Sequence, residues 1–420
     1  MVDNSNISLS LPYGIILLSI LGICVLKTNV GIIIGAFLSY ISFSRVILFS
    51  GIALIWLLAL SGVMAGILYY FKFYWKKIKI TPLFRWIIPI MLFWWFYTLL
   101  TIVLTSPAYE RALIRNIFMY MALPIPIIYL IAKDRNQVNG FIFGYILTTL
   151  LNGLIIMEMI GIQNNIFSIN QWISSALKIQ LAISNYHRIG ISFGISTIFL
   201  FSMILNSKTK LKILYFLPLF IFILTCLFLI GSRQLMLASI ICIFSIILLS
   251  TKKNQGKGNA LIYFLLIIIS LSIYFIYDNF QSIILRSGNF ESALDDAYID
   301  RIDNWLKGIK LGVSSLIFGT FFSTRYGHNL FISTFESQGL VGLSLLLFYF
   351  YFVKKVISIG EDFNWELLAM IFIFVFGLIH GQFSGDFVSI PHLYWPIAFL
   401  WGYLSSEQNL EEKRIARKIF

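Results

Sequence analysis

The sequence predicts an all-α polytopic membrane protein with roughly 12 or 13 transmembrane helices, in one integral membrane domain that covers residues 1–420. Hydrophobic residues make up 59% of the chain and charged residues 12%, whereas soluble domains carry about 25% charged residues. The mean hydropathy is +0.89. Apolar stretches of roughly 20 residues, the length that a spanning helix needs, recur from one end of the chain to the other.

The first ten residues, Met1 to Ser10, lack a basic region, so we expect no cleavable signal peptide. No internal repeat or low-complexity linker divides the chain. Cys24, Cys226 and Cys242 all lie in apolar runs and are expected to be core residues rather than metal ligands or disulfides. The expected spans are 10–27, 30–44, 46–71, 84–105, 113–132, 138–161, 189–206, 211–230, 234–250, 260–277, 329–353, 366–383 and 390–404.

Basic loops alternate with the spans and predict the orientation of the chain. By the positive-inside rule, these loops are cytoplasmic. The segments 162–188 and 278–328 are then outer loops, together with the turn at Gly231-Ser232-Arg233. The net charge of +13 therefore reports topology, and we expect no nucleic acid partner. The cytoplasmic loops are Lys72 to Lys79, Lys133/Arg135, Lys208 to Lys212, Lys252 to Lys257, Lys354/Lys355 and the tail from Lys413 to Lys418.

Arginine is concentrated on the outer side of this topology. Of the 31 Lys and Arg residues, 11 fall outside, and eight of these are arginines. Lysine already supplies the charge that orientation requires, whereas the guanidinium group binds phosphate through two donors at once. The asymmetry favours an anionic, phosphate-bearing ligand, with arginine snorkelling toward lipid headgroups as the alternative. The outer residues are Arg45, Arg111, Arg115, Lys178, Arg188, Arg233, Arg286, Arg301, Lys307, Lys310 and Arg325.

The outer loop 278–328 is much longer than the other loops, and loops of such length are usually functional or disordered. Between Arg301 and Gly312, the apolar residues recur at helical spacing and predict an amphipathic helix on the membrane surface. The acids around its start are typical of a solvated loop face, although a metal site is conceivable without a firm ligand spacing. The apolar residues are Ile302, Trp305, Leu306 and Ile309; the acids are Glu291, Asp295, Asp296, Asp300 and Asp303.

His328-Asn329 places a titratable, hydrogen-bonding pair where this loop enters a long apolar helix. Ionisable groups at a membrane edge are candidates for a functional site, and an imidazole titrates near neutral pH. There it can accept a proton from an attacking hydroxyl, and the free N–H groups of the helix start favour an anion nearby. The alternative is that Asn329 simply caps the helix and His328 fills the interface. Gly339 and Gly342, further along this helix, permit close packing.

The remaining ionisable residues near the outer side are expected to be structural. His187, His380 and His392 are typical of interfacial residues, and Asp386 lies in a Gly-Asp turn between the last two spans. Glu158, near the outer end of its span, is expected to pair with an arginine.

In four motifs the chain resembles the superfamily of bacterial O-antigen polymerases and O-antigen ligases. They are Arg-x-Gly-x-x-Phe (Arg188 to Phe193), Gly-Ser-Arg (Gly231 to Arg233), Arg-x-x-x-Trp in the long loop (Arg301 to Trp305), and His-Asn-x9-Gly-x2-Gly (His328 to Gly342). The order along the chain is that of the family. The last motif is fairly specific, whereas Gly-Ser-Arg alone is weak. The motifs cover about residues 185 to 350, and the N-terminal spans match only in hydropathy.

The resemblance implies a metal-independent glycosyltransferase with a GT-C-like fold and no cofactor. It implies transfer of a whole glycan from undecaprenyl diphosphate to a hydroxyl acceptor, on the outer face of the bacterial cytoplasmic membrane, with a chain-length regulator as a possible protein partner. His328 then acts as the general base or orients the acceptor. Arg233 and Arg301 bind the diphosphate leaving group, and the long loop 278–328 covers the cleft. Further candidates for contacting the substrate are Arg188, Arg286, Arg325, Tyr326 and Asn329.

Polymerases and ligases share all these motifs. A polymerase transfers the chain to the next lipid-linked repeat unit of O-antigen or capsule, and a ligase transfers it to lipid A-core. The two outer loops both carry arginines, which favours the polymerase because two lipid-linked substrates must be held. A flippase for lipid-linked oligosaccharides is the alternative from another class. Transporters place polar groups near the bilayer midplane, whereas the expected ionisable groups here gather at one face.

Overall fold

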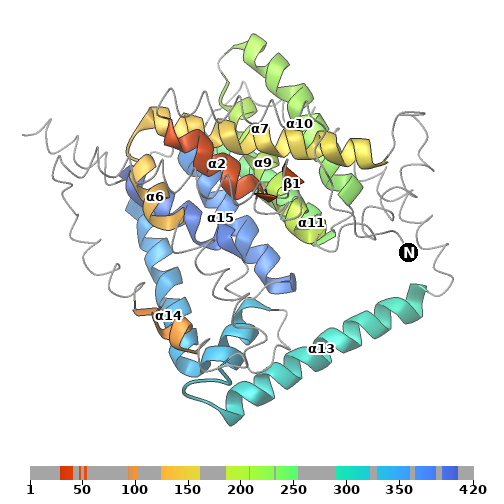
Figure 1. Cartoon of the computed structure of the whole chain (residues 1–420), viewed down its shortest axis with the longest axis vertical. Helices are drawn as coiled ribbons and strands as arrows, with labels where there is room; N and C mark the ends of the chain where they lie inside the picture. Colours follow the sequence, from red (N-terminus) through yellow and green to blue (C-terminus); the bar gives the residue numbers. More distant parts are fainter. Residues whose placement is uncertain are drawn as a thin grey trace, which may run out of the picture.

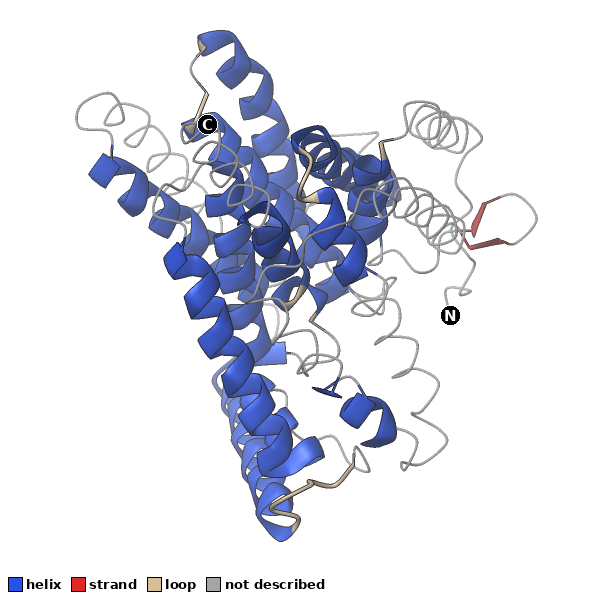
Figure 2. Ribbon diagram, turned by 90° about the vertical axis from the view of Figure 1, so that its left-hand side faces the viewer, coloured by secondary structure: helices blue, strands red, loops and turns tan. Residues whose placement is uncertain are grey.

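The computed structural model describes the chain in thirteen separate stretches. They are residues 29–40, 47–48, 52–53, 93–94, 96–101, 124–160, 186–207, 209–230, 233–253, 290–321, 329–359, 365–384 and 390–404. Nearly all of them are helical, and one antiparallel strand pair is the exception (Figure 2). Two helical stretches are long and apolar enough to cross a membrane, Leu330–Lys354 and Trp365–Gln382.

The elements follow the chain as α2 (Val30–Tyr40), β1 (Ile47–Leu48), β2 (Ile52–Ala53), α6 (Pro124–Ile131), α7 (Arg135–Ile160), α9 (Tyr186–Leu205), α10 (Lys210–Ile230), α11 (Arg233–Lys253), α13 (Phe290–Ser314), α14 (Leu330–Ile359), α15 (Trp365–Ser384) and η2 (Pro391–Leu393) (Figure 1). Residues 93–94, 96–101 and 395–404 are also helical. The predicted spans at 189–206, 211–230, 234–250 and 366–383 each coincide with one of these helices.

The expected span 46–71 is wrong at its start. Ile47 pairs with Ala53 and Leu48 with Ile52 in a two-stranded antiparallel pair. Isoleucine is β-branched and fits an extended backbone well, so an apolar run alone does not determine a helix. The remainder of that expected span lies outside the described residues.

Glycines join α2 to α7. Gly31 and Gly35 on α2, and Gly140 and Gly144 on α7, repeat at a spacing of four. A methyl group added to Gly31, Gly35 or Gly144 would collide with backbone carbonyl oxygens of the facing helix. Small residues at this spacing let two backbones approach closely, which is the usual device for packing helices where hydrophobic burial does not drive association. The Gly31 N–H also donates to the buried Gln137 Oε1 at 3.0 Å.

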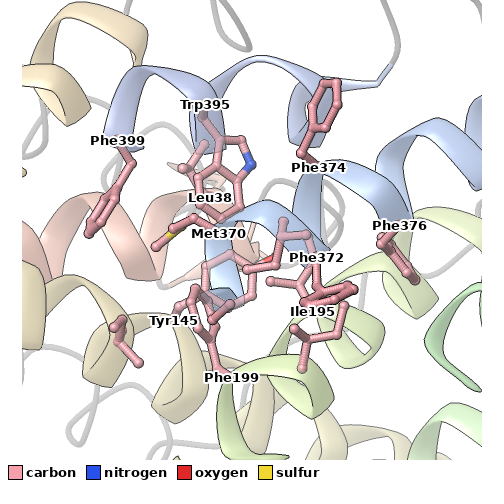
Figure 3. Packing of buried hydrophobic residues seen from close by; sticks show 14 of the residues in the cluster. Leu38, Tyr145, Ile195, Phe199, Met370, Phe372, Phe374, Phe376, Trp395 and Phe399 are labelled. Atoms are coloured by element: carbon pink, nitrogen blue, oxygen red, sulfur yellow. The ribbon is translucent and has the colours of Figure 1, made fainter. Parts of the chain in front are cut away.

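An aromatic cluster fills the centre of the bundle (Figure 3). Tyr145 of α7 packs edge-on against Phe199 of α9, with ring centroids 5.8 Å apart, and lies 6.1 Å from the Trp395 ring. Phe141, one turn earlier on α7, lies 5.4 Å from Trp395. All four rings are at most 2% exposed. Helices from the middle and the C-terminal end of the chain therefore share one core.

Lys133, in the turn between α6 and α7, provides a test of the packing at the end of α6. Its Nζ lies 4.3 Å from the centre of the Tyr129 ring, and burial lowers the pKa of Lys133 to about 8. The unfolded chain then binds more protons than the folded chain between about pH 8 and 10.5, so stability rises with pH in that window. Lys133→Met is expected to flatten this rise, as measured by thermal unfolding of the detergent-purified protein. Equal pH slopes for both proteins would contradict the burial of the ammonium group.

Candidate functional site

The predicted site residues divide into two groups. Asn329 is described with its side chain, and the backbone of Arg188, Arg233 and Arg301 is described. The others, Arg286, Arg325, Tyr326 and His328, lie outside the described residues.

Asn329 caps the N-terminus of α14, as the sequence predicted in one of its two interpretations. Its Oδ1 accepts from the Phe331 N–H at 3.0 Å and from the Ile332 N–H at 3.3 Å. Its Nδ2 donates to the Gln382 side chain at 3.0 Å and to the Gln382 carbonyl at 3.3 Å. Both ends of the amide are engaged in the fold, so Asn329 fixes the start of α14 to the end of α15. A contact with substrate stays a prediction.

A second contact supports this junction. Gly381 of α15 faces Leu330 of α14, so a methyl group built on Gly381 would lie 3.4 Å from Leu330 Cβ. Leu330 itself is fully buried. The start of α14 therefore packs directly beside the last turn of α15.

The same end of the bundle also receives the first turns of α9 and α11. Three helices meet at one level, where a methyl group on Gly194 of α9 would lie 2.6 Å from the Phe376 ring of α15 and 3.0 Å from Ser239 Oγ of α11. Cys242 Sγ donates to the Phe372 carbonyl at 3.3 Å, which shows that α11 and α15 are antiparallel. The end of α15 and the start of α11 therefore lie on the same side of this level.

The direction of α9 relative to α15 follows from the contacts that both helices make with α7. Ser196 of α9 donates to Thr149 of α7 at 2.8 Å, and Phe199 packs on Tyr145, so α7 and α9 are antiparallel. Arg135, the first residue of α7, approaches Glu366 in the first turn of α15 to 3.9 Å, so α7 and α15 start at the same end of the bundle. The start of α9 therefore lies beside the end of α15.

Arg188, Arg233 and Gln382 lie equally far along their helices from the level at which α9, α11 and α15 meet. Arg188 is six residues before Gly194, Arg233 is six before Ser239, and Gln382 is six after Phe376. At 1.5 Å per residue, each backbone lies about 9 Å from the shared level. The structure therefore brings the backbones of Arg188 and Arg233 to the same end of the bundle as Asn329. The starts of α9, α11 and α14 meet there, and the dipoles and free N–H groups of such helix starts favour an anion.

Glu158 lies at the same end. It is nine residues past Thr149 on α7, and Arg188 is eight residues before Ser196 on α9. Since Thr149 and Ser196 are hydrogen-bonded between antiparallel helices, the backbones of Glu158 and Arg188 lie at similar levels. The sequence predicted an arginine partner for Glu158, and this register makes Arg188 the nearest candidate among those with a described backbone.

Arg301 is not brought to this end by the described contacts. The amphipathic helix expected between Arg301 and Gly312 is part of one longer helix of 25 residues, α13, which extends away from the bundle (Figure 1). It contacts α14 near its C-terminus, where Gly312 lies against the Phe335 ring. Arg301 is 11 residues earlier, or about 16 Å along the helix. Leu306 and Ile309, from the predicted apolar stripe, are exposed, whereas Ile302 and Trp305 are partly buried.

Reasoning from the sequence missed a buried polar run in the first part of α14. Within residues 333–338, the side chains of Ser333, Thr334, Glu336, Ser337 and Gln338 are all buried, with Gln338 fully enclosed. Five polar residues out of six, in an otherwise apolar stretch, were a signal visible in the sequence. They lie between the His-Asn pair and Gly339 and belong to the same site region.

His380 and His392 are buried below the junction, with their ring centroids 5.3 Å apart. They were expected to be interfacial residues, whereas both lie in the buried core; a structural role stays a prediction. Of the other two residues expected to be structural, His187 is described by its backbone in α9, and Asp386 lies outside the described residues.

Among the residues whose placement is described, no group of three or more His, Cys, Asp or Glu side chains could hold a metal ion. No protein-family model matches the chain, and no curated protein matches it.

Proposed function

We propose that this chain is a membrane glycosyltransferase of the O-antigen polymerase type, located in the bacterial cytoplasmic membrane with its site facing outward. Its donor is an undecaprenyl-diphosphate-linked oligosaccharide, and its acceptor is a hydroxyl of the next lipid-linked repeat unit. In this proposal the described helices belong to a GT-C-like domain of roughly 12 or 13 spans. The observation that supports the proposal is that the backbones of Arg188 and Arg233 lie at the same end of the bundle as Asn329, the residue that follows His328 in the chain.

The proposed reaction is a displacement at the first carbon of the donor sugar. The acceptor hydroxyl oxygen attacks this carbon while His328 takes the hydroxyl proton, and the bond to the diphosphate oxygen breaks. Undecaprenyl diphosphate leaves with the electron pair of that bond. Arg188 and Arg233, at the starts of α9 and α11, neutralise the charge that develops on the leaving group. Arg301 joins them only when α13 brings its N-terminal part over the site.

Guanidinium groups neutralise a diphosphate without a metal ion, so we expect transfer to be independent of divalent cations. The measurement compares initial rates of the purified protein before and after treatment with EDTA. Equal rates are expected. A loss of activity in EDTA that added Mg²⁺ restores would contradict the arginine-based mechanism.

The test of the proposed function supplies purified protein with one lipid-linked repeat unit and no lipid A-core. A ladder of longer lipid-linked glycans identifies a polymerase. Inertness until lipid A-core is added identifies a ligase, and inertness with both acceptors contradicts glycosyl transfer.

One observation favours the transporter alternative. The helix α14 is interrupted at Gly339, next to the buried polar run 333–338, and interrupted helices with polar surroundings line the substrate sites of many transporters. The ladder assay separates the two functions, because a flippase moves the lipid-linked unit between leaflets without joining two units. Reconstitution in vesicles with the unit in one leaflet only reports that movement directly.

A further inference from the structure

The helix α14 consists of two helices that meet at Gly339. This residue has φ +60° and ψ −153°, a conformation outside any helix. In a continuous helix the N–H groups of residues 340 and 341 would donate to the carbonyls of residues 336 and 337. Here they donate to the carbonyls of Leu316 and Ile317 instead, at 2.9 and 3.2 Å.

The carbonyls of residues 336 and 337, which the break leaves without their helical donors, accept hydrogen bonds from the segment that follows α13. Thr320 N–H donates to the Glu336 carbonyl at 2.8 Å, and Phe321 N–H donates to the Ser337 carbonyl at 3.0 Å. The turn after α13 thus inserts into the break and replaces the missing helical hydrogen bonds on both sides. Buried backbone groups must be paired, so the break persists only while this turn is in place.

Gln338 fixes the other side of the break. Its Oε1 accepts from Trp94 Nε1 at 3.1 Å, and its Nε2 donates to Thr98 Oγ1 at 2.8 Å. Its carbonyl accepts from the Tyr97 hydroxyl, which also reaches the Phe318 carbonyl, both at 3.2 Å. Gln338 is 0% exposed, so these bonds are made away from water. One side chain therefore ties the helical residues 93–101 to the end of helix 330–338.

We propose that Gln338 is a positioning residue for the start of α14, which carries Asn329 and which His328 precedes in the chain. Helix 330–338 has the junction between Asn329 and Gln382 of α15 at one end and Gln338 at the other. The amide of Gln338, held by Trp94 and Thr98, sets the direction of this helix and hence the position of Asn329 against α15. The catalytic part of this inference rests on the proposed glycosyl transfer, whereas the structural part does not.

Packing alone does not require an amide at this position. A methionine has a similar volume and fills the same space, but it makes neither hydrogen bond and leaves the donor of Trp94 and the hydroxyl of Thr98 less well satisfied. What the amide adds is a fixed orientation. A displacement of about 1 Å at reacting atoms lowers a rate by about a hundredfold.

The experiment measures the junction itself through a disulfide. Leu330→Cys combined with Gly381→Cys places two thiols where the Cβ atoms are 3.4 Å apart, close to the 3.5–4.5 Å typical of a disulfide. Oxidation of the membrane-embedded double variant is expected to form this crosslink rapidly. Adding Gln338→Met is expected to slow the crosslinking about tenfold, corresponding to the loss of one or two hydrogen bonds.

A matched control uses the same substitution elsewhere. Gln137 is also buried, and it accepts from Gly31 N–H at the opposite end of the bundle. Gln137→Met is expected to leave the crosslinking rate unchanged. Trp94→Phe removes the indole N–H together with part of the ring system, and the hydrogen-bond part of its effect on the rate is not expected to add to that of Gln338→Met, because both remove the bond between Trp94 and Gln338.

The activity readout separates positioning from binding. With the cysteines absent, Gln338→Met is expected to lower kcat about a hundredfold while KM for the lipid-linked donor stays within about twofold. Wild-type crosslinking rates in both Gln338→Met and Trp94→Phe would overturn the positioning role, whether or not transfer is affected. If the wild-type protein shows no transfer, the proposed function fails, and the crosslinking rates still decide whether Gln338 sets the junction. Trp94→Phe decides the same question if Gln338→Met does not fold.

Discussion

Alanine at His328 or at Arg301 is expected to abolish detectable glycosyl transfer while the protein accumulates in the membrane at the wild-type level. Loss of a general base costs about a hundredfold to ten-thousandfold in rate, and removal of a charge that stabilises the leaving group costs a comparable factor. The expected loss is one of chemistry and not of the fold, which the amount of protein in the membrane reports. The measurement is the glycan ladder made from one lipid-linked repeat unit, normalised to the amount of protein.

Matched controls separate the two roles from general damage. His187→Ala removes an imidazole next to Arg188, and it is expected to keep wild-type activity because no chemistry is assigned to that ring. Arg301→Lys keeps the charge but not the forked donors, so it is expected to recover only part of the rate. Ladders of wild-type length and intensity from His328→Ala or Arg301→Ala would refute the assignment of that residue.

Alanine at Gly339 is expected to cause a large loss of stability, because both the backbone conformation and the space around this residue require glycine. With φ +60° and ψ −153°, the residue occupies a region that is essentially restricted to glycine, at a cost of about 1–3 kcal/mol for other residues. A Cβ there would also lie 2.5 Å from the carbonyl carbon and oxygen of Ile317 and 2.6 Å from Gly319 N. These are backbone atoms of the inserted turn, which cannot move without losing its own hydrogen bonds to α14.

Thermal unfolding in detergent measures this effect, with Gly381→Ala as the control. The closest atom to a Cβ on Gly381 is Ile390 Cδ1 at 2.9 Å, the free end of a flexible side chain, so that variant is expected to unfold near the wild-type temperature. A Gly339→Ala protein that unfolds together with the wild type would show that α14 is not broken at this residue.

Much of the helical arrangement could be predicted from local pattern. The helices α9, α10 and α11 follow from apolar runs separated by Lys208 to Lys212 and by the Gly231-Ser232 dipeptide. The cap at Asn329 follows from the preference of asparagine for helix starts. These features depend on neighbouring residues in the chain, which the sequence displays directly.

The break at Gly339 could not be predicted in the same way. The stretch 329–353 is apolar enough to read as one continuous helix, and Gly339 was expected only to permit close packing. The break is stabilised by Leu316, Ile317 and the residues after them, which belong to the segment predicted to be a long loop, and by Trp94, which is 244 residues away from Gln338. Pairings of that range are tertiary, and one sequence does not reveal them.

The placement of the arginines was predicted in part. Arg188 and Arg233 were expected on the outer side, and the shared level of Gly194, Ser239 and Phe376 puts their backbones at one end of the bundle. Arg301 was expected beside them, but α13 is one long helix whose described contacts with α14 lie about 16 Å further along. Helical periodicity predicts which face of α13 is apolar, but it does not predict where the helix docks.

The central claim is that arginines from separate helices and one imidazole share a cavity that binds the donor diphosphate. The most direct measurement is a cryo-electron microscopy structure of the protein with a lipid-linked diphosphate donor bound. We expect the two phosphates between the guanidinium groups of Arg188 and Arg233, with His328 facing the first sugar and Arg301 closing over them. Density for the diphosphate at any other place, with these side chains directed into lipid, would contradict the account.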